Sequence, residues 1–130
     1  MEKTISFKLP FGKEKVELTL LESQVNGVLT SKINEYIPPC DKNAIVKQAV
    51  ENPIGSQKLE DLARGKNKVC LIASDHTRPV PSKIIVPLML EKIRKGNPNA
   101  DITILIATGL HRFTTKDELV YKFGEEIVKK

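Results

Sequence analysis

Two apolar segments rich in β-branched residues, 68–73 and 101–107, are each followed by a short polar loop and then by a stretch with helical spacing. Strand, loop and helix in this repeated order are typical of βαβ units, in which the strands pair in parallel. The carboxyl ends of parallel strands share one edge of the sheet, where ligands of open α/β folds bind. We therefore expect the loops 74–81 and 108–113 to lie side by side at a binding site.

The rest of the chain completes an α/β prediction. Segments 4–9 and 15–21 are separated by a turn that contains Gly12, which predicts an antiparallel N-terminal β-hairpin. A proline-rich connector ends at residue 40. We expect a single α/β domain over residues 1–130, with the hairpin and connector in 1–40 and a Rossmann-like βαβ core in 41–130.

The core is expected to hold a mainly parallel sheet with flanking helices. Capping and stop residues predict helices over 41–51, 58–64 and 81–95, and a last helix that starts after Thr114 or Thr115. The segment 68–73 is apolar at successive positions, which indicates a strand buried on both faces and, within it, a buried Cys70.

Composition argues against several classes of partner. The net charge of +5 comes mostly from scattered lysines, and aromatic residues make up 5% of the chain with no Trp, so we expect no nucleic-acid binding. The longest apolar run, 84–90, contains Pro87 and is too short to span a membrane. Cys40 and Cys70 have no zinc-type spacing, and the N-terminus has no apolar signal segment, so we expect a cytoplasmic protein in a reducing compartment.

The first polar loop, Ser74-Asp75-His76-Thr77-Arg78-Pro79-Val80-Pro81, carries groups suited to an anion. Arg78 offers a planar fork of donors for a carboxylate or phosphate, and Thr77 adds a hydroxyl. Asp75 can orient that fork, bind a ribose hydroxyl or hold a water molecule. The structural alternative is a helix-capping loop with a surface Asp75–Arg78 pair.

The second polar loop, Thr108-Gly109-Leu110-His111-Arg112-Phe113, carries a candidate base. Gly109 permits a turn with positive φ directly after the strand. His111 then projects at the strand end, where an imidazole can take a proton from a hydroxyl and return it. Arg112 would help keep His111 neutral if the two side chains converge. A structural or merely solvated histidine is the alternative.

In these two loops the chain resembles the nickel-dependent lactate racemase family, over residues 74–81 and 107–112. The resemblance covers roughly the last two-thirds of the chain. Supporting similarity runs through 48–56, 81–91 and 114–124, and the likeness is weaker before Cys40. It implies racemisation of lactate or another 2-hydroxy acid with a nickel-pincer nucleotide, in which a histidine takes the hydroxyl proton while the α-hydride moves to a pyridinium ring.

By resemblance, His111 matches one of two acid/base histidines, Arg78 the loop arginine of the substrate and cofactor pocket, and Asp75 the aspartate that helps shape it. Family members are several times longer, and their cofactor-tethering lysine, nickel-ligating histidine and second acid/base histidine have no counterpart here. The resemblance therefore implies an N-terminal fragment with no metal-binding residue, no cofactor bound alone and no activity alone. Its expected partners are a 2-hydroxy acid, the remainder of the parent chain and, through an exposed sheet edge, a second copy.

A function of a different class uses the same residues. The chain could be a stand-alone module that binds an anion or mononucleotide without catalysis, with Asp75, Thr77, Arg78 and Gly109 forming the site. Binding of mononucleotides by the isolated chain separates this hypothesis from the racemase fragment.

Overall fold

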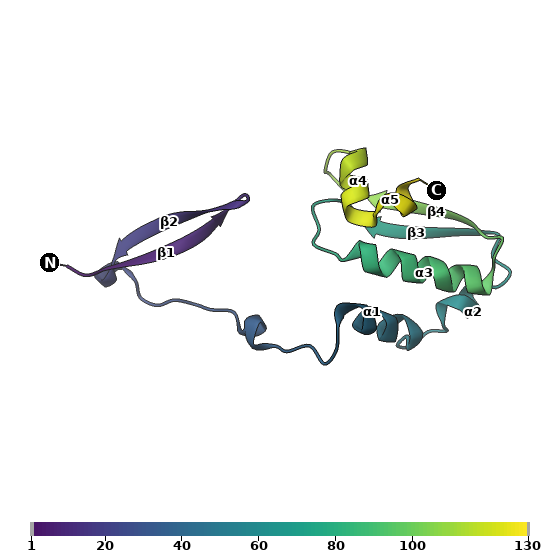
Figure 1. The fold of residues 1–130 in the computed structure, drawn as a ribbon, viewed down its shortest axis with the longest axis horizontal. Helices are drawn as coiled ribbons and strands as arrows, with labels where there is room; N and C mark the ends of the chain where they lie inside the picture. Colours follow the sequence, from purple (N-terminus) through teal and green to yellow (C-terminus); the bar gives the residue numbers. More distant parts are fainter. Residues whose placement is uncertain (1, 130) are drawn as a thin grey trace. The chain divides into compact units, whose positions relative to one another are not determined.

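The computed structural model describes residues 2–129, so Met1 and Lys130, at the ends of the expected single domain, lie outside the described residues. The chain forms two compact units, residues 1–38 and 39–130 (Figure 1). In its described residues the first unit contains two strands, β1 (Thr4–Phe11) and β2 (Glu14–Leu21). The second contains the elements that carry both polar loops: α1 (Lys42–Glu51), α2 (Leu59–Ala63), β3 (Lys68–Ser74), α3 (Ser82–Gly96), β4 (Asp101–Ala107), α4 (Lys116–Phe123) and α5 (Glu125–Val128).

The predicted N-terminal hairpin is confirmed. β1 (Thr4–Phe11) pairs antiparallel with β2 (Glu14–Leu21), in a register that joins Thr4 to Leu21 and Phe11 to Glu14. Gly12 has φ of 61° in the connecting turn, a conformation that glycine adopts without a steric penalty. Short 3-10 turns at Glu22–Gln24 and Lys32–Glu35 are the regular structure of the segment after the hairpin, within the described part of this unit.

The second unit contains the predicted parallel strand pair. β3 and β4 are parallel along their whole length, with Lys68 beside Asp101 and Ser74 beside Ala107. However, the prediction of a mainly parallel sheet is wrong. Within residues 2–129 the strands form two separate two-stranded sheets, one antiparallel and one parallel. The two βα units supply only two parallel strands, which is no more than the hairpin contributes in antiparallel strands.

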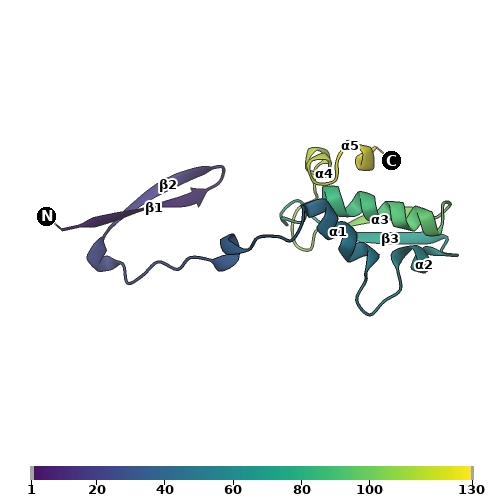
Figure 2. The ribbon, with the colours of Figure 1, turned by 60° about the horizontal axis from the view of Figure 1, so that its bottom comes forward.

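The core of the second unit lies between β3–β4 and α3. Ile93 of α3 is fully buried beside Ala63 and Ala100, and strand residues Val69 and Leu71 pack against this cluster. Figures 1 and 2 show α3 running along the strands, with α2 beside its carboxyl-terminal end. Gly96, at the end of α3, lets the backbone of α2 approach closely, since a Cβ at Gly96 would lie 2.0 Å from the carbonyl oxygen of Glu60.

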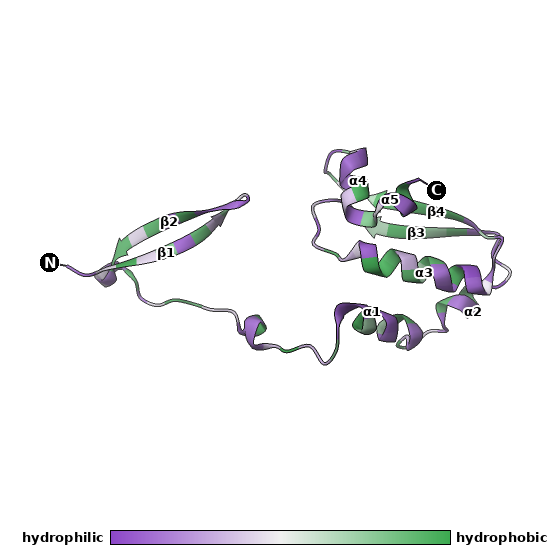
Figure 3. Ribbon diagram, viewed as in Figure 1, coloured by the Kyte–Doolittle hydropathy of each residue, from purple (hydrophilic) through white to green (hydrophobic). Residues whose placement is uncertain are grey.

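Residues on the opposite face of the parallel pair are exposed, so the prediction that 68–73 is buried on both faces is wrong. Cys70 is exposed, Ile72 is 73% exposed and Leu105 on β4 is 52% exposed. Figure 3 shows hydrophobic, green segments along β3 and β4. A continuous apolar run indicates two apolar faces, but burial of both requires two covering layers, and α3 covers one.

Helix boundaries follow the predicted capping residues. Asp41 caps α1, since its carboxylate accepts hydrogen bonds from the backbone N–H groups of Asn43 and Ala44. Thr115 caps α4 in a capping box with Glu118. Gly124 ends α4 with φ of 90°. Among residues 2–129, the structure has no helix with the length and apolar content needed to cross a bilayer.

Candidate functional site

The two polar loops leave the parallel strands at the same edge. Ser74 and Ala107 are paired at the carboxyl ends of β3 and β4, so residues 75–81 and 108–115 begin beside one another. Gly109 has φ of 57°, as expected for a sharp turn directly after the strand, and the N–H of His111 donates to the carbonyl oxygen of Thr108 at 3.0 Å. This turn directs the His111 side chain back toward the first loop.

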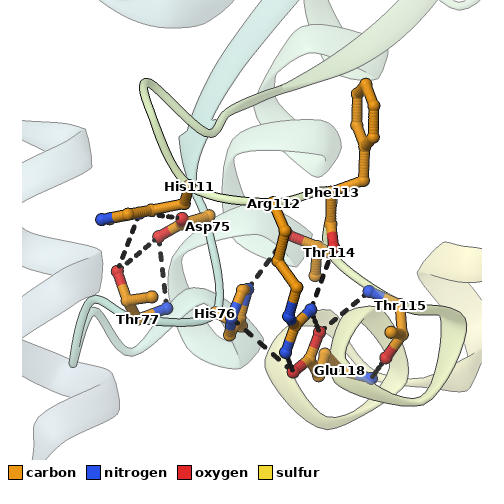
Figure 4. Close-up of polar contacts among 9 residues, drawn as sticks. All are labelled: Asp75, His76, Thr77, His111, Arg112, Phe113, Thr114, Thr115 and Glu118. Carbon is orange, nitrogen blue, oxygen red and sulfur yellow. Dashed lines mark hydrogen bonds and ion pairs between the residues drawn. The ribbon is translucent and has the colours of Figure 1, made fainter.

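His111 and Asp75 form a hydrogen-bonded pair (Figure 4). Nδ1 of His111 lies 2.5 Å from Oδ2 of Asp75. Asp75 is only 1% exposed, whereas the His111 side chain is 44% exposed. The other oxygen of Asp75 accepts hydrogen bonds from Thr77, from the hydroxyl at 2.7 Å and from the backbone N–H at 3.2 Å. The buried carboxylate therefore binds one ring nitrogen of an imidazole that solvent can reach.

These hydrogen bonds fix the charge of Asp75. The hydroxyl of Thr77 and then the imidazole of His111, together with the Thr77 N–H, lower the pKa of Asp75 from 3.8 to about 2 against the opposing effect of burial. Asp75 is thus a carboxylate at neutral pH and can only accept a proton at its contact with His111. Nδ1 of neutral His111 therefore carries the hydrogen, and Nε2 presents a lone pair.

Arg78 does not form the surface ion pair with Asp75 that was the structural alternative for this loop. The carboxylate of Asp75 is bonded to Thr77 and His111 and makes no ion pair with Arg78 among the described residues. Arg78 instead lines a cavity of about 420 Å³ at the amino-terminal end of α3, together with His76, Thr77 and Lys83. His111 is not among the described residues that line this cavity, so Thr77 is the residue that joins the cavity to the Asp75–His111 pair.

A buried lysine of α4 forms a hydrogen bond with the first polar loop at Arg78. Lys122 is 7% exposed, and its ammonium group donates a hydrogen bond of 2.9 Å to the carbonyl oxygen of Arg78. Lys122 also lines the cavity beside Arg78 and Lys83, and the described residues around the cavity include no Asp or Glu. The cavity therefore has a positive lining, which suits a carboxylate or phosphate group.

Arg112 does not converge on His111, contrary to the expectation that it helps keep the imidazole neutral. Its guanidinium donates to both carboxylate oxygens of Glu118, at 2.9 and 2.7 Å. This pair lowers the pKa of Glu118 from 4.5 to about 2 and raises that of Arg112. His76, from the first loop, contacts the same region, because its Nδ1 lies 3.3 Å from the Thr114 hydroxyl.

Sequence reasoning missed the contact of Lys122 with Arg78 and the contact of Glu118 with Arg112. The signal for Glu118 was the Thr115-x-x-Glu118 spacing of a capping box, which indicates a helix start but does not indicate an arginine partner. Lys122 carries no local signal, since only the packing of α4 against the first loop distinguishes it from an exposed lysine.

The described residues fit part of the cofactor that the resemblance implies. Within residues 2–129, no three His, Cys, Asp or Glu side chains gather in a way that could hold a metal ion, so nickel has no ligand set in this part of the chain. The positive lining at Arg78, Lys83 and Lys122 fits an anionic group of a nucleotide or of a hydroxy acid.

Comparison with known proteins identifies relatives of this arrangement. The family model of the lactate racemase N-terminal domain matches residues 11–130. The lactate racemases of Thermoanaerobacterium thermosaccharolyticum and Lactiplantibacillus plantarum are 48% and 44% identical to the chain over 124 residues, which cover 95% of this chain and 29% of each relative. The structure of the lactate racemase apoprotein from T. thermosaccharolyticum matches with a TM-score of 0.79 at 47% identity, covering 97% of this chain and 28% of that one. The chain thus spans less than a third of the length of the curated relatives it matches. It belongs to the lactate racemase N-terminal domain family.

Proposed function

We propose that this chain supplies the acid/base and anion-binding part of a site that racemises lactate or a related 2-hydroxy acid. The observation that carries the proposal is the Asp75–His111 pair, in which a buried carboxylate holds Nδ1 of an imidazole whose side chain is 44% exposed. Membership of the lactate racemase N-terminal domain family supports the substrate class.

In the proposed reaction His111 moves one proton. Its Nε2 accepts the proton of the substrate hydroxyl while the bond between the α-carbon and its hydrogen breaks, which gives a planar 2-keto acid, and it returns the proton when the α-hydrogen is restored on either face. The nickel-pincer nucleotide implied by the family, when bound, supplies the acceptor for the α-hydride. Asp75 keeps the imidazole in the Nδ1–H tautomer and stabilises the imidazolium that forms.

Arg78 and its surroundings bind the negative charge in this proposal. The guanidinium can pair with a carboxylate through two parallel hydrogen bonds, and Lys122 holds the backbone of the same residue. The bound anion is the substrate carboxylate or the phosphate of the nucleotide, both of which suit the positive cavity. The remainder of a longer parent chain is the proposed source of the metal ligands, and the cytoplasm is the proposed compartment.

A chimera tests the proposal. Residues 1–130 replace the matching N-terminal part of the T. thermosaccharolyticum lactate racemase, and lactate racemisation is followed by chiral separation. We expect an active chimera that loses about 10²–10⁴-fold in kcat in His111→Asn. Arg78→Ala is expected to raise KM, since it removes an anion contact. Lys116→Met, an exposed lysine in the first turn of α4, is the control with unchanged kinetics.

Two outcomes contradict the proposal. Full activity in His111→Asn refutes the acid/base role. An inactive but folded chimera, combined with tight mononucleotide binding by the 130-residue chain that Arg78→Ala abolishes, favours the non-catalytic binding module. Binding is measured by calorimetry with mononucleotides and with lactate in parallel.

A further inference from the structure

Glu118 connects the two loops that carry the candidate site. It lies in the first turn of α4 and is 28% exposed. Its carboxylate accepts two hydrogen bonds from Arg112, the residue directly after His111, and one from the N–H of Thr115 at 2.9 Å. Nε2 of His76, the residue directly after Asp75, lies 3.6 Å from its Oε1.

The Asp75–His111 contact links the two loops directly, and Glu118 links the same two loops at a second place. In Figure 4 the guanidinium of Arg112 extends from the second loop to Glu118, and His76 reaches the same carboxylate from the first loop. Each partner is one residue away from a member of the Asp75–His111 pair. Because neighbouring Cα atoms are 3.8 Å apart, a loop displaced at Arg112 or at His76 carries His111 or Asp75 with it.

We propose that Glu118 is a positioning residue, which holds His111 on Asp75 by fixing Arg112 and His76. The catalytic meaning of this role rests on the proposed function, but the positioning itself does not. Glu118 touches neither the imidazole of His111 nor the cavity at Arg78 among the described contacts, so it acts through its neighbours. A capping residue alone would need neither the arginine fork nor the contact with His76.

The His111 tautomer is the observable that reports this position. Bonded to Asp75, neutral His111 carries its hydrogen on Nδ1, whereas an imidazole free in water favours the Nε2–H form. Long-range ¹H–¹⁵N spectra of the ¹⁵N-histidine-labelled chain separate the two forms. We expect the Nδ1–H form in the wild-type chain and a fall of roughly fivefold in the Nδ1–H to Nε2–H ratio in Glu118→Gln.

Glu118→Gln is chosen because glutamine also completes a capping box, so the helix start is retained while the charge that binds Arg112 is removed. Asp117→Asn is the matched control, since it removes the same charge from the same helix turn at an exposed position. Arg112→Met removes the partner from the other side and should shift the tautomer as Glu118→Gln does, with no further change in the double variant.

An unchanged His111 tautomer in Glu118→Gln, with circular dichroism and Tm showing a folded chain, overturns the proposal. If Glu118→Gln does not fold, the His111 tautomer ratio in Arg112→Met tests the proposal in the same way. An equal shift in Asp117→Asn also overturns it, because the effect is then one of helix charge. The measurement needs no substrate or cofactor, so a shifted tautomer supports the positioning role even where an inactive chimera and tight mononucleotide binding count against the racemase function.

Discussion

The contact between Gly96 and Glu60 allows a prediction of sign and size. Gly96→Ala places a Cβ 2.0 Å from the Glu60 carbonyl oxygen and 2.8 Å from its carbonyl carbon. Ordinary contact begins at 3.4 Å, so α2 must withdraw by about 1.4 Å at this point. Helix propensity alone favours Ala over Gly by about 1 kcal/mol. The forced separation costs about 1–3 kcal/mol and also loosens the packing around Ile93.

We therefore expect Gly96→Ala to destabilise the second unit by about 1 kcal/mol, because a steric cost in the middle of this range, about 2 kcal/mol, exceeds the propensity gain of about 1 kcal/mol. For a unit of this size, that corresponds to a fall in Tm of about 4–8 °C. Thermal and urea unfolding followed by circular dichroism give both quantities.

Two other glycines separate steric from backbone effects. Gly65→Ala meets nothing within 4 Å but must adopt φ of 68°, so it is expected to cost about 1–2 kcal/mol through the backbone alone. Gly27→Ala has neither problem and should leave Tm nearly unchanged. A Tm for Gly96→Ala equal to or above that of wild type would refute the inferred closeness of α2 and α3.

Three further predictions concern the candidate site. Asp75→Asn keeps the acceptor for Thr77 but turns an amide N–H group toward Nδ1 of His111, so we expect the Nε2–H tautomer by ¹⁵N NMR. We also expect kcat of the chimera to fall about 10²–10⁴-fold, and a retained Nδ1–H form would contradict the prediction. The folded-state pKa values of Asp75 and Glu118, about 2, lie below their ordinary 3.8 and 4.5, so both groups stabilise the fold above about pH 4.5 and lose that contribution as the pH falls toward 2. Unfolding in urea across this range should show the loss, and the Asp75→Asn variant should show a smaller slope. Lys122→Met removes the donor to the Arg78 carbonyl and should raise the amide mobility of the Arg78 loop in NMR relaxation, whereas rigid amides there would count against the contact.

Local patterns predicted the elements well. Alternation, a glycine turn and capping residues identified the hairpin, the helix capped by Asp41 and the helix that starts after Thr115. These features depend on residues within a few positions of one another, which is why one sequence suffices. The apolar run of β3 was misjudged, since Cys70 and Ile72 have the right side chains for a core but lie on a face that no described residue covers.

The candidate site was predicted in its parts and not in its pairings. Loop chemistry selected Asp75, Arg78 and His111, and the parallel-strand rule placed their loops together. The partners differ from expectation because each charge takes the nearest complementary group in three dimensions. Asp75 pairs with His111, and Arg112 pairs with Glu118 from a helix that begins several residues later.

Because α4 is short, the contacts that it makes with the two loops can open without unfolding of the Ile93 core. At eight residues, α4 is too short to persist as an isolated helix and depends on its packing against α3, where Lys83 lies 5.4 Å from the ring centre of Tyr121. Glu118 and Lys122 are one helical turn apart, so fraying of α4 detaches both in a single event. Amide hydrogen exchange at the two loops should then follow the free energy of opening of α4, which is lower than that of the Ile93 core. This local equilibrium sets the fraction of molecules in which Glu118 and Lys122 hold the two loops.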